Sequence, residues 1–336
     1  MKHTPKVLTI CFLSLFSFLI TGCSGSEPPD IPRAQESPAA SSRSSDATSG
    51  SSADKPSKSA QDAPLRDNTP RVLVPEASGS EVYENDFSSI DASHTAEGYV
   101  MIRYTGSNTK VKLRITGPDQ AEYVYLLSGT GEYETFPLTS GSGAYQVQIL
   151  ENAGGDMYAV AYSTDLNVTI SNEFGPFLYP NQYVNFNPQS KTVAKGSELA
   201  KDAHSDLEAI ENIYHYIIKE ISYDQQKAES VSYGYLPVVD ETLSSKKGIC
   251  FDYAAVMSTM LRSQGIPTKL EVGYSGEAYH AWISTYITET GWVDKIIQFD
   301  GSSWTLMDPT LAANNDRKAV GQYVGDGSNY VVKYSY

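Results

Sequence analysis

The chain has 336 residues, and its 25 Lys and Arg against 40 Asp and Glu give a formal net charge of −15 at pH 7. This acidic balance argues against nucleic acid as a partner, because phosphate binding needs a basic surface, and it provides no attraction to anionic lipids. The sequence contains three cysteines. So few thiols exclude a disulfide-rich scaffold.

The first segment, residues 1–22, is expected to be a secretion signal. Lys2 and Lys6 precede the apolar stretch 7–20, and small residues follow it, a pattern typical of an exported protein and not of a membrane-spanning helix. The run that ends at Cys23 resembles the bacterial lipobox, whose cysteine is linked to diacylglycerol and becomes the mature N-terminus. The alternative is a plain signal with an incidental cysteine. We expect a lipid-anchored protein on the outer face of the bacterial cell membrane, held by acyl chains on Cys23.

Residues 23–70 are predicted to form a disordered linker. They are rich in Ser, Ala, Pro and Asp, contain no aromatic residue, and offer Ile31 and Leu65 as their large aliphatic side chains. Such a composition cannot bury enough apolar area to offset the entropy of the chain. The linker is expected to hold the folded part away from the membrane.

Residues 71–180 are predicted to form an all-β, sandwich-like domain. Short apolar runs alternate with polar residues at period two, and glycine-rich turns separate them. Roughly seven or eight such strands in about 110 residues favour a β-sandwich. The clearest runs are 111–115, 145–149, 158–162 and 168–170. The many tyrosines are interpreted as half-buried packing residues, with a carbohydrate- or peptide-binding face as the alternative.

Residues 195–336 are predicted to form a second domain, of α+β class. Large apolar residues recur at spacings of three and four over 207–221, after the capping-box sequence 205–208, which predicts a helix that begins near residue 206. Helices followed by antiparallel strands define the α+β class. The strand-like runs are 268–274, 279–288, 292–299 and 303–308.

Cys250 is the single cysteine of the predicted folded part, and it begins an apolar run that predicts a helix over 250–263. A helix start offers unpaired backbone N–H groups and the positive end of the dipole, both of which favour a thiolate. Gly248 is expected to allow the tight entry into this helix, and the backbone N–H of Cys250 to serve as an oxyanion donor. The alternative is a buried, inert cysteine. The sequence makes Cys250 a candidate nucleophile.

His280 and Asp308 complete a candidate triad in the order thiol, imidazole, carboxylate. His280 is the one histidine that follows Cys250, and it lies in a predicted strand. Asp308 ends another predicted strand, where its carboxylate would orient the imidazole. Each has a structural alternative, as a hydrogen-bonded strand histidine and as an Asp-Pro turn. Asp294 and Asp300 are the other candidate carboxylates.

The segment KKGICFDYAAVMSTMLRSQGIPTKLEVGY, with YHAWI and WTLMDPT after it, resembles the core of the transglutaminase-like superfamily over about residues 205–312. Three motifs occur in the family's order, which makes the resemblance specific. It implies a papain-like domain in which Cys250 is the nucleophile, His280 the base and Asp308 its orienting partner.

The resemblance also implies a second oxyanion donor upstream of the cysteine, for which Tyr233 and Tyr235 are candidates. The family includes protein cross-linking acyltransferases, cysteine peptidases, amidases and non-catalytic modules, and its enzymes share a thioester acyl-enzyme. We predict an exported thiol enzyme that acts on a peptide or glutamine side-chain amide of the cell envelope or its surroundings, by hydrolysis or acyl transfer. The alternative is a non-catalytic cell-surface scaffold that binds peptides or cell wall. No metal site or cofactor is predicted, since the acidic residues lack EF-hand spacing.

Overall fold

The computed structural model describes residues 64–275, 278–288, 291–293, 298–299, 304–305 and 330–336. All of them fall within one compact unit, Ser57–Tyr336. The predicted signal, most of the predicted linker and Cys23 lie outside the described residues, as do Asp308, Asp294 and Asp300. No helix in the described part of the chain is long and apolar enough to cross a membrane.

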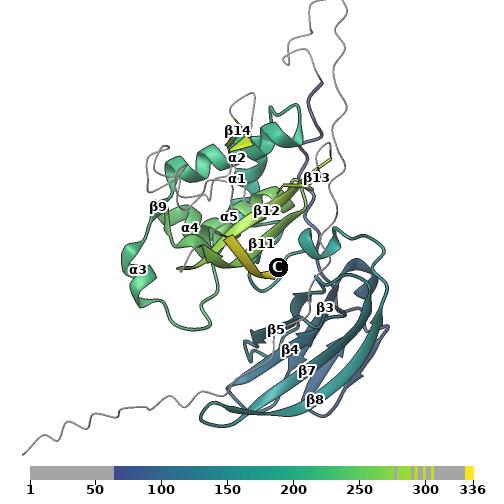
Figure 1. Cartoon of the computed structure of the whole chain (residues 1–336). Helices are drawn as coiled ribbons and strands as arrows, with labels where there is room; N and C mark the ends of the chain where they lie inside the picture. Colours follow the sequence, from purple (N-terminus) through teal and green to yellow (C-terminus); the bar gives the residue numbers. More distant parts are fainter. Residues whose placement is uncertain (1–63, 276–277, 289–290, 294–297, 300–303, 306–329) are drawn as a thin grey trace, which may run out of the picture. The chain divides into compact units, whose positions relative to one another are not determined.

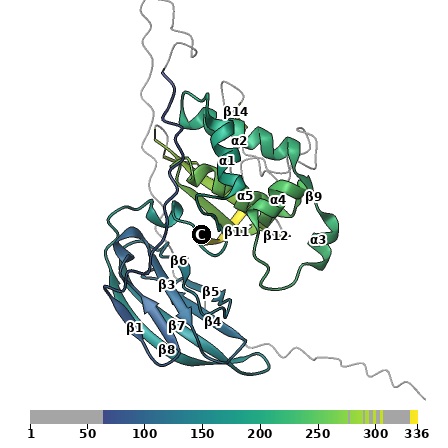
Figure 2. The same ribbon diagram turned by 180° about the vertical axis from the view of Figure 1, so that it is seen from behind.

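The first part of the described chain is an antiparallel β-sandwich of two four-stranded sheets (Figures 1 and 2). One sheet has the strand order β1-β2-β3-β6, and the other has the order β5-β4-β7-β8. The strands are β1 (Val82–Glu84), β2 (Ser88–Asp91), β3 (Tyr99–Tyr104), β4 (Val111–Thr116), β5 (Glu122–Leu126), β6 (Glu134–Pro137), β7 (Gly143–Gly154) and β8 (Met157–Val168), with short 3-10 helices η2 (Thr95–Glu97) and η3 (Gly175–Phe177) beside them.

The alternation in the sequence explains the sandwich. In β4, Val111, Leu113 and Ile115 are buried while the residues between them are half-buried. Leu113 and Ile115 pair with Ile149 and Val147 of β7, which are also buried. Period two sends alternate side chains to opposite faces, so one face of each strand faces the core. Each such aliphatic side chain contributes roughly 1.5–3 kcal/mol when fully buried. The predicted all-β architecture is confirmed.

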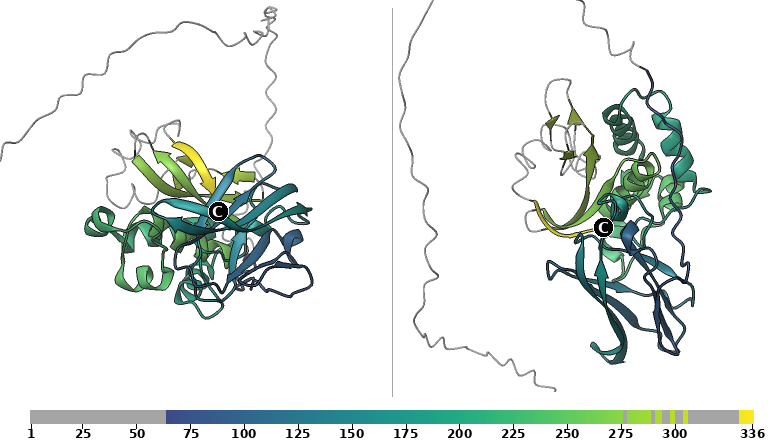
Figure 3. Two further views of the ribbon diagram at one scale, coloured as in Figure 1. Left: turned by 90° about the horizontal axis from the view of Figure 1, so that it is seen from below. Right: turned by 90° about the vertical axis from the view of Figure 1, so that its right-hand side faces the viewer.

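The second part of the described chain combines helices with a four-stranded antiparallel sheet, in the order β13-β12-β11-β16. Figure 3 shows the helices gathered on one face of this sheet. The fold class is therefore α+β, as predicted. Its elements are α1 (Lys191–Ala200), α2 (Asp206–Glu220), α3 (Gln225–Ser230), α4 (Val239–Ser245), α5 (Cys250–Arg262), β11 (Thr268–Ser275), β12 (Ala278–Ile287), β13 (Gly291–Val293) and β16 (Tyr330–Ser335), with short pairs β9 (Ser222–Tyr223) with β10 (Lys247–Gly248) and β14 (Gln298–Phe299) with β15 (Trp304–Thr305).

The helix α2 begins where its cap predicts. The hydroxyl of Ser205 accepts from the backbone N–H of Glu208 at 3.2 Å, while the Glu208 carboxylate accepts from the N–H of His204 and not from that of Ser205. Its apolar stripe is buried, with Ile210 and Ile217 almost fully inaccessible. The helix ends at Glu220.

The helix α5 lies at the centre of the second part and contacts β11, β12, α1, α2 and α4. Because neighbours surround it, every residue from Asp252 to Arg262 is buried. Arg262, at its last turn, is fully buried and donates to the main-chain oxygens of Thr268, Tyr179 and Tyr336 at 2.7–2.9 Å. These three bonds join the end of α5 to three separate segments of the chain.

Contacts begin earlier than the predicted linker end at residue 70. The backbone N–H of Arg66 donates to the carbonyl of Ala203, and its guanidinium binds Asp206 at 2.8 Å and the carbonyl of Gln264 at 2.8 Å. The predicted linker, 23–70, is therefore too long at its C-terminal end. Polar hydrogen bonds, and not an apolar pattern, hold this part, so composition did not reveal it.

Candidate functional site

Cys250 is the first residue of α5, and its side chain is partly exposed. The first N–H groups of a helix have no partner within the helix, so the thiol lies beside free donors and the positive end of the dipole. Gly248 has an ordinary backbone conformation, contrary to the expected role in a tight turn. It matters for its small size, because a Cβ there would lie 2.7 Å from the Cβ of Asp252.

A buried carboxylate fixes this helix start. Asp252 is fully buried and accepts from the backbone N–H of Ile249 at 2.8 Å. It also binds Lys227 Nζ at 2.7 Å and accepts from the Tyr235 hydroxyl at 2.5 Å. A buried carboxylate is stable only when it is paired and hydrogen-bonded, and here it has both kinds of partner. Asp252 thus ties α3 and the loop at Tyr235 to the residue just before Cys250.

His280 lies on β12, where it pairs with Gly273 of β11. Its ring is half-buried and stacks near Trp282, with centroids 6.5 Å apart and planes at 26°. The Trp282 indole N–H donates to Glu271 at 2.8 Å, which holds this part of the sheet. The predicted strand around His280 is confirmed, and the structure places the His280 and Trp282 rings on one face of it.

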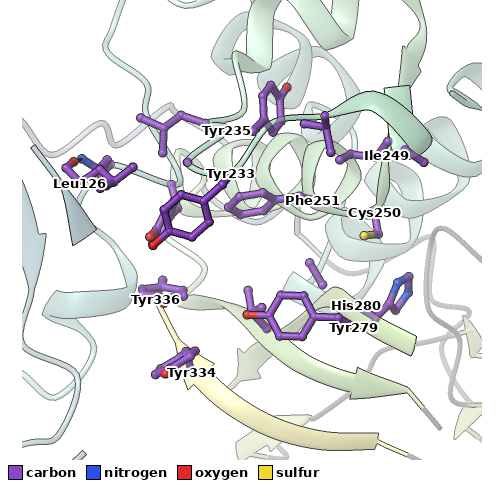
Figure 4. A pocket seen from close by; sticks show the side chains of 18 of the residues that line it. Leu126, Tyr233, Tyr235, Ile249, Cys250, Phe251, Tyr279, His280, Tyr334 and Tyr336 are labelled. Carbon is purple, nitrogen blue, oxygen red and sulfur yellow. Dashed lines mark hydrogen bonds between the residues drawn. The ribbon is translucent and has the colours of Figure 1, made fainter. Parts of the chain in front are cut away.

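Cys250 and His280 line the same cavity, which has a volume of about 650 Å³ (Figure 4). This volume falls in the usual range for small-ligand and peptide side-chain sites. Figure 4 shows the thiol and the imidazole at one end of the view, with Leu126 and Tyr336 toward the other end. The structure therefore brings together two of the three residues of the candidate triad. Asp308 lies outside the described residues, so its place in the triad stays a prediction.

The two candidate oxyanion tyrosines differ. The hydroxyl of Tyr235 donates its single proton to Asp252 and accepts from Lys227, so in this arrangement it has no proton for an oxyanion. Burial raises the pKa of Tyr235 strongly, and the Asp252 carboxylate raises it further. Tyr233 is 84% exposed and lines the cavity. Of the two, the geometry leaves Tyr233 available.

Several residues in and around the cavity were not identified from the sequence. Lys227 does not line the cavity but supports the helix start beside it, because the fold brings its ammonium to Asp252. Val124 and Leu126 are others, since they belong to β5 of the sandwich and yet line the cavity beside Cys250. The alternation of these apolar residues with their neighbours predicts a strand but does not indicate a functional site.

This arrangement suits nucleophilic chemistry on an acyl group. A thiol at a helix start has donors for a developing oxyanion, and an imidazole in the same cavity is the usual proton acceptor. Among the described residues, no cluster of His, Cys, Asp or Glu has the geometry of a metal site. We assign no step to a metal.

Part of the chain is similar to known proteins. Residues 194–309 match the family model described as the transglutaminase-like superfamily. The chain is similar to kyphoscoliosis peptidase of Mus musculus, with 27% identity over 129 residues that cover 33% of this chain and 19% of that protein. It is also similar to a UPF0252 protein of Methanocaldococcus jannaschii, with 28% identity over 144 residues, 39% of each chain. The chain spans less than two fifths of the length of either relative.

Solved structures give weaker similarities. A candidate cysteine protease from Cytophaga hutchinsonii has a TM-score of 0.32 and 16% identity, covering 68% of each chain. Red sea bream transglutaminase has a TM-score of 0.25 and 13% identity, covering 63% of this chain and 48% of that one. Both scores are too low to carry an argument about this chain.

Proposed function

Because residues 194–309 belong to the transglutaminase-like superfamily, we propose that this chain is a thiol enzyme that cleaves or transfers the acyl group of a peptide or glutamine side-chain amide. The observation that supports it most is the shared cavity of Cys250 and His280, with the thiol at the start of a buried helix. The carboxylate that orients the imidazole is proposed to be Asp308.

The proposed reaction has two steps. The Cys250 sulfur attacks the amide carbon, a C–S bond forms, and the oxyanion is held by backbone N–H groups at the start of α5 and by the Tyr233 hydroxyl. His280 passes the thiol proton to the leaving nitrogen as the C–N bond breaks, which yields a thioester. Water or an amine then attacks the thioester carbon and His280 takes its proton. The C–S bond breaks as His280 gives that proton to the sulfur, which restores the thiol. Water gives hydrolysis, and an amine gives acyl transfer.

Thiol reactivity tests this proposal without a known substrate. The full chain is treated with iodoacetamide at pH 7, and the peptide that carries Cys250 is quantified by mass spectrometry. We expect alkylation of Cys250 to slow at least about tenfold in His280→Ala, because the imidazole generates the thiolate. His215→Ala, a histidine on α2 outside the cavity, is the control and should leave the rate unchanged.

Equal rates in His280→Ala and the unchanged chain would contradict the enzyme assignment and favour a non-catalytic binding protein. A substrate sharpens the test once one is found. Cys250→Ala should then abolish the acyl-enzyme, and Asp308→Asn should slow turnover by about three orders of magnitude with the fold intact, because an amide stabilises the wrong imidazole tautomer.

We further propose that the chain is lipid-anchored through Cys23 on the outer face of the bacterial cell membrane. The lipobox-like run before Cys23 supports this. Labelled palmitate should enter the protein in the producing cells, and Cys23→Ala should abolish the label. Labelling that survives this substitution would contradict the proposal.

A further inference from the structure

The cavity beside Cys250 is lined mainly by aromatic and aliphatic side chains. Figure 4 shows the rings of Phe251, Tyr279, Tyr334 and Tyr336 around it. The remaining lining residues are further tyrosine and aliphatic side chains, with Gln182, Gly234, Cys250 and His280. Among the described residues, no Asp, Glu, Lys or Arg side chain lines this cavity.

The tyrosines of the lining do not supply charge. Burial raises the pKa of Tyr183 to about 12 and raises that of Tyr336 still further. Tyr183 and Tyr336 lie edge to face, with centroids 4.4 Å apart. An uncharged group loses little when it leaves water for such a surface, whereas a charged group loses its hydration and has no Asp, Glu, Lys or Arg partner among the described lining residues.

The sandwich provides one wall of the cavity. Val124 and Leu126 lie on β5, an edge strand of its sheet. The Gln182 side chain donates to the carbonyl of Leu126 at 2.6 Å, and Gly234 lies so close that a Cβ there would overlap the Leu126 side chain. The wall from β5 is thus in contact with both the connecting segment and the loop that carries Tyr233.

We propose that this cavity selects an uncharged, apolar side chain, aromatic or large aliphatic, on the peptide whose amide reaches Cys250, and that Val124 and Leu126 of the sandwich help to set this selectivity. The inference rests on the proposed function, because it assigns the substrate class of that same site. A sugar ring fits less well. Saccharide recognition needs polar partners for many hydroxyl groups, whereas aliphatic side chains form much of this lining and Gln182 is already engaged.

Protection of Cys250 from iodoacetamide tests the selectivity. The probes are four capped pentapeptides that differ only at the central residue, which is Phe, Leu, Lys or Glu. The full chain is alkylated at pH 7 with increasing peptide, and the Cys250 peptide is quantified by mass spectrometry. We expect the Phe and Leu peptides to halve the alkylation rate at concentrations about tenfold or more below those of the Lys and Glu peptides.

A matched set of variants tests the role of the sandwich wall. Val124 is 41% exposed, and Val160, on the opposite edge strand β8, is 50% exposed and does not line the cavity. Val124→Lys should improve protection by the Glu peptide about threefold or more, and Val124→Glu should do the same for the Lys peptide. A misfolded protein could not produce this reciprocal exchange. Val160→Glu should keep the order in which the four peptides protect Cys250 in the unchanged chain.

Equal protection by all four peptides, or no protection by any, would overturn the inference, and so would Val124 variants that keep the original order. These outcomes are separate from a failure of the proposed function. If Cys250 alkylates no faster than it does in His280→Ala, the enzyme assignment fails. If it alkylates faster but shows no preference among the peptides, the selectivity alone fails.

Discussion

The sandwich and the helix-containing part treat buried polar groups differently. In the sandwich, Asp91 is buried and accepts from the backbone N–H groups of Gly79 and Ser93, which lie 12 and 2 residues from it in the sequence. In the second part, Asp252 and Arg262 are fully buried at the two ends of α5, and each joins segments far apart in the sequence. The sandwich is organised by alternating apolar residues, whereas α5 is positioned by polar groups at its ends.

This difference indicates which part of the molecule depends on a fixed geometry. Apolar packing tolerates changes of similar volume, while a buried ion with several directed hydrogen bonds fixes one geometry. Cys250 stands at one end of α5, so an error in the helix position would displace the thiol from His280. The polar groups at the ends of α5 are therefore best understood as positioning residues.

Removal of Arg262 should have the largest effect on stability. Arg262→Met keeps most of the volume but removes a donor from three main-chain oxygens, of which the Tyr336 oxygen keeps the N–H of Leu270. We expect the free energy of unfolding to fall by about 4 kcal/mol, measured by urea denaturation. Arg71→Met is the control, because the Arg71 side chain is 59% exposed, and it should change stability by no more than about 0.5 kcal/mol. If Arg262→Met lowered the free energy of unfolding as little as Arg71→Met does, the buried polar group at the end of α5 would not be what holds that helix.

The pair Asp252→Asn and Asp91→Asn compares the two regions directly, since both carboxylates are buried. Asp252→Asn removes the charge that faces Lys227, and we expect a loss of about 2–3 kcal/mol together with slower alkylation of Cys250. Asp91→Asn should cost about 1–2 kcal/mol and leave alkylation unchanged. If both variants alkylate at the original rate, Asp252 only stabilises the fold.

The smallest effect is expected at Tyr179, whose hydroxyl donates to Glu97 of η2 at 2.5 Å. This hydrogen bond, assisted by His94, lowers the pKa of Glu97. A lowered folded-state pKa stabilises the protein above the unfolded-state pKa, and this contribution is lost as the pH falls through the folded value. Tyr179→Phe should raise the pKa of Glu97 in a carboxyl NMR titration and cost less than about 1 kcal/mol at pH 7, because Glu97 is 45% exposed. An unchanged Glu97 titration would show that the hydroxyl does not set it.

Local patterns were sufficient for much of the fold. The alternation in β4 and the helix start after Ser205 both depend on neighbouring residues, and both predictions are confirmed. The start of α5 at Cys250 and the strand around His280 were likewise predictable, because each combines periodicity with a glycine-rich boundary. The motif order then suggested that the two residues share a site, and they line one cavity.

Long-range contacts were not predictable in this way. The helix α1 is capped by Asp240, which accepts from the N–H groups of Lys191 and Thr192 nearly fifty residues earlier. The strand β16 pairs with β11, where a Cβ on Gly273 would overlap the carbonyl oxygen of Val331. The contribution of β5 to the cavity wall is also a long-range contact, since nothing near Val124 in the sequence indicates which residues lie beside it in the fold.

The contacts of Arg66 determine which segments a pulling force on the N-terminal end of the described chain reaches first. Arg66 precedes the first sandwich strand in the sequence, but its partners Ala203, Asp206 and Gln264 belong to the helix-containing part. A pull at residue 64 therefore loads the start of α2 and the segment after α5 before it reaches β1. Such a load would act on the segment after α5, which is the end of that helix opposite Cys250, before it acts on the sandwich.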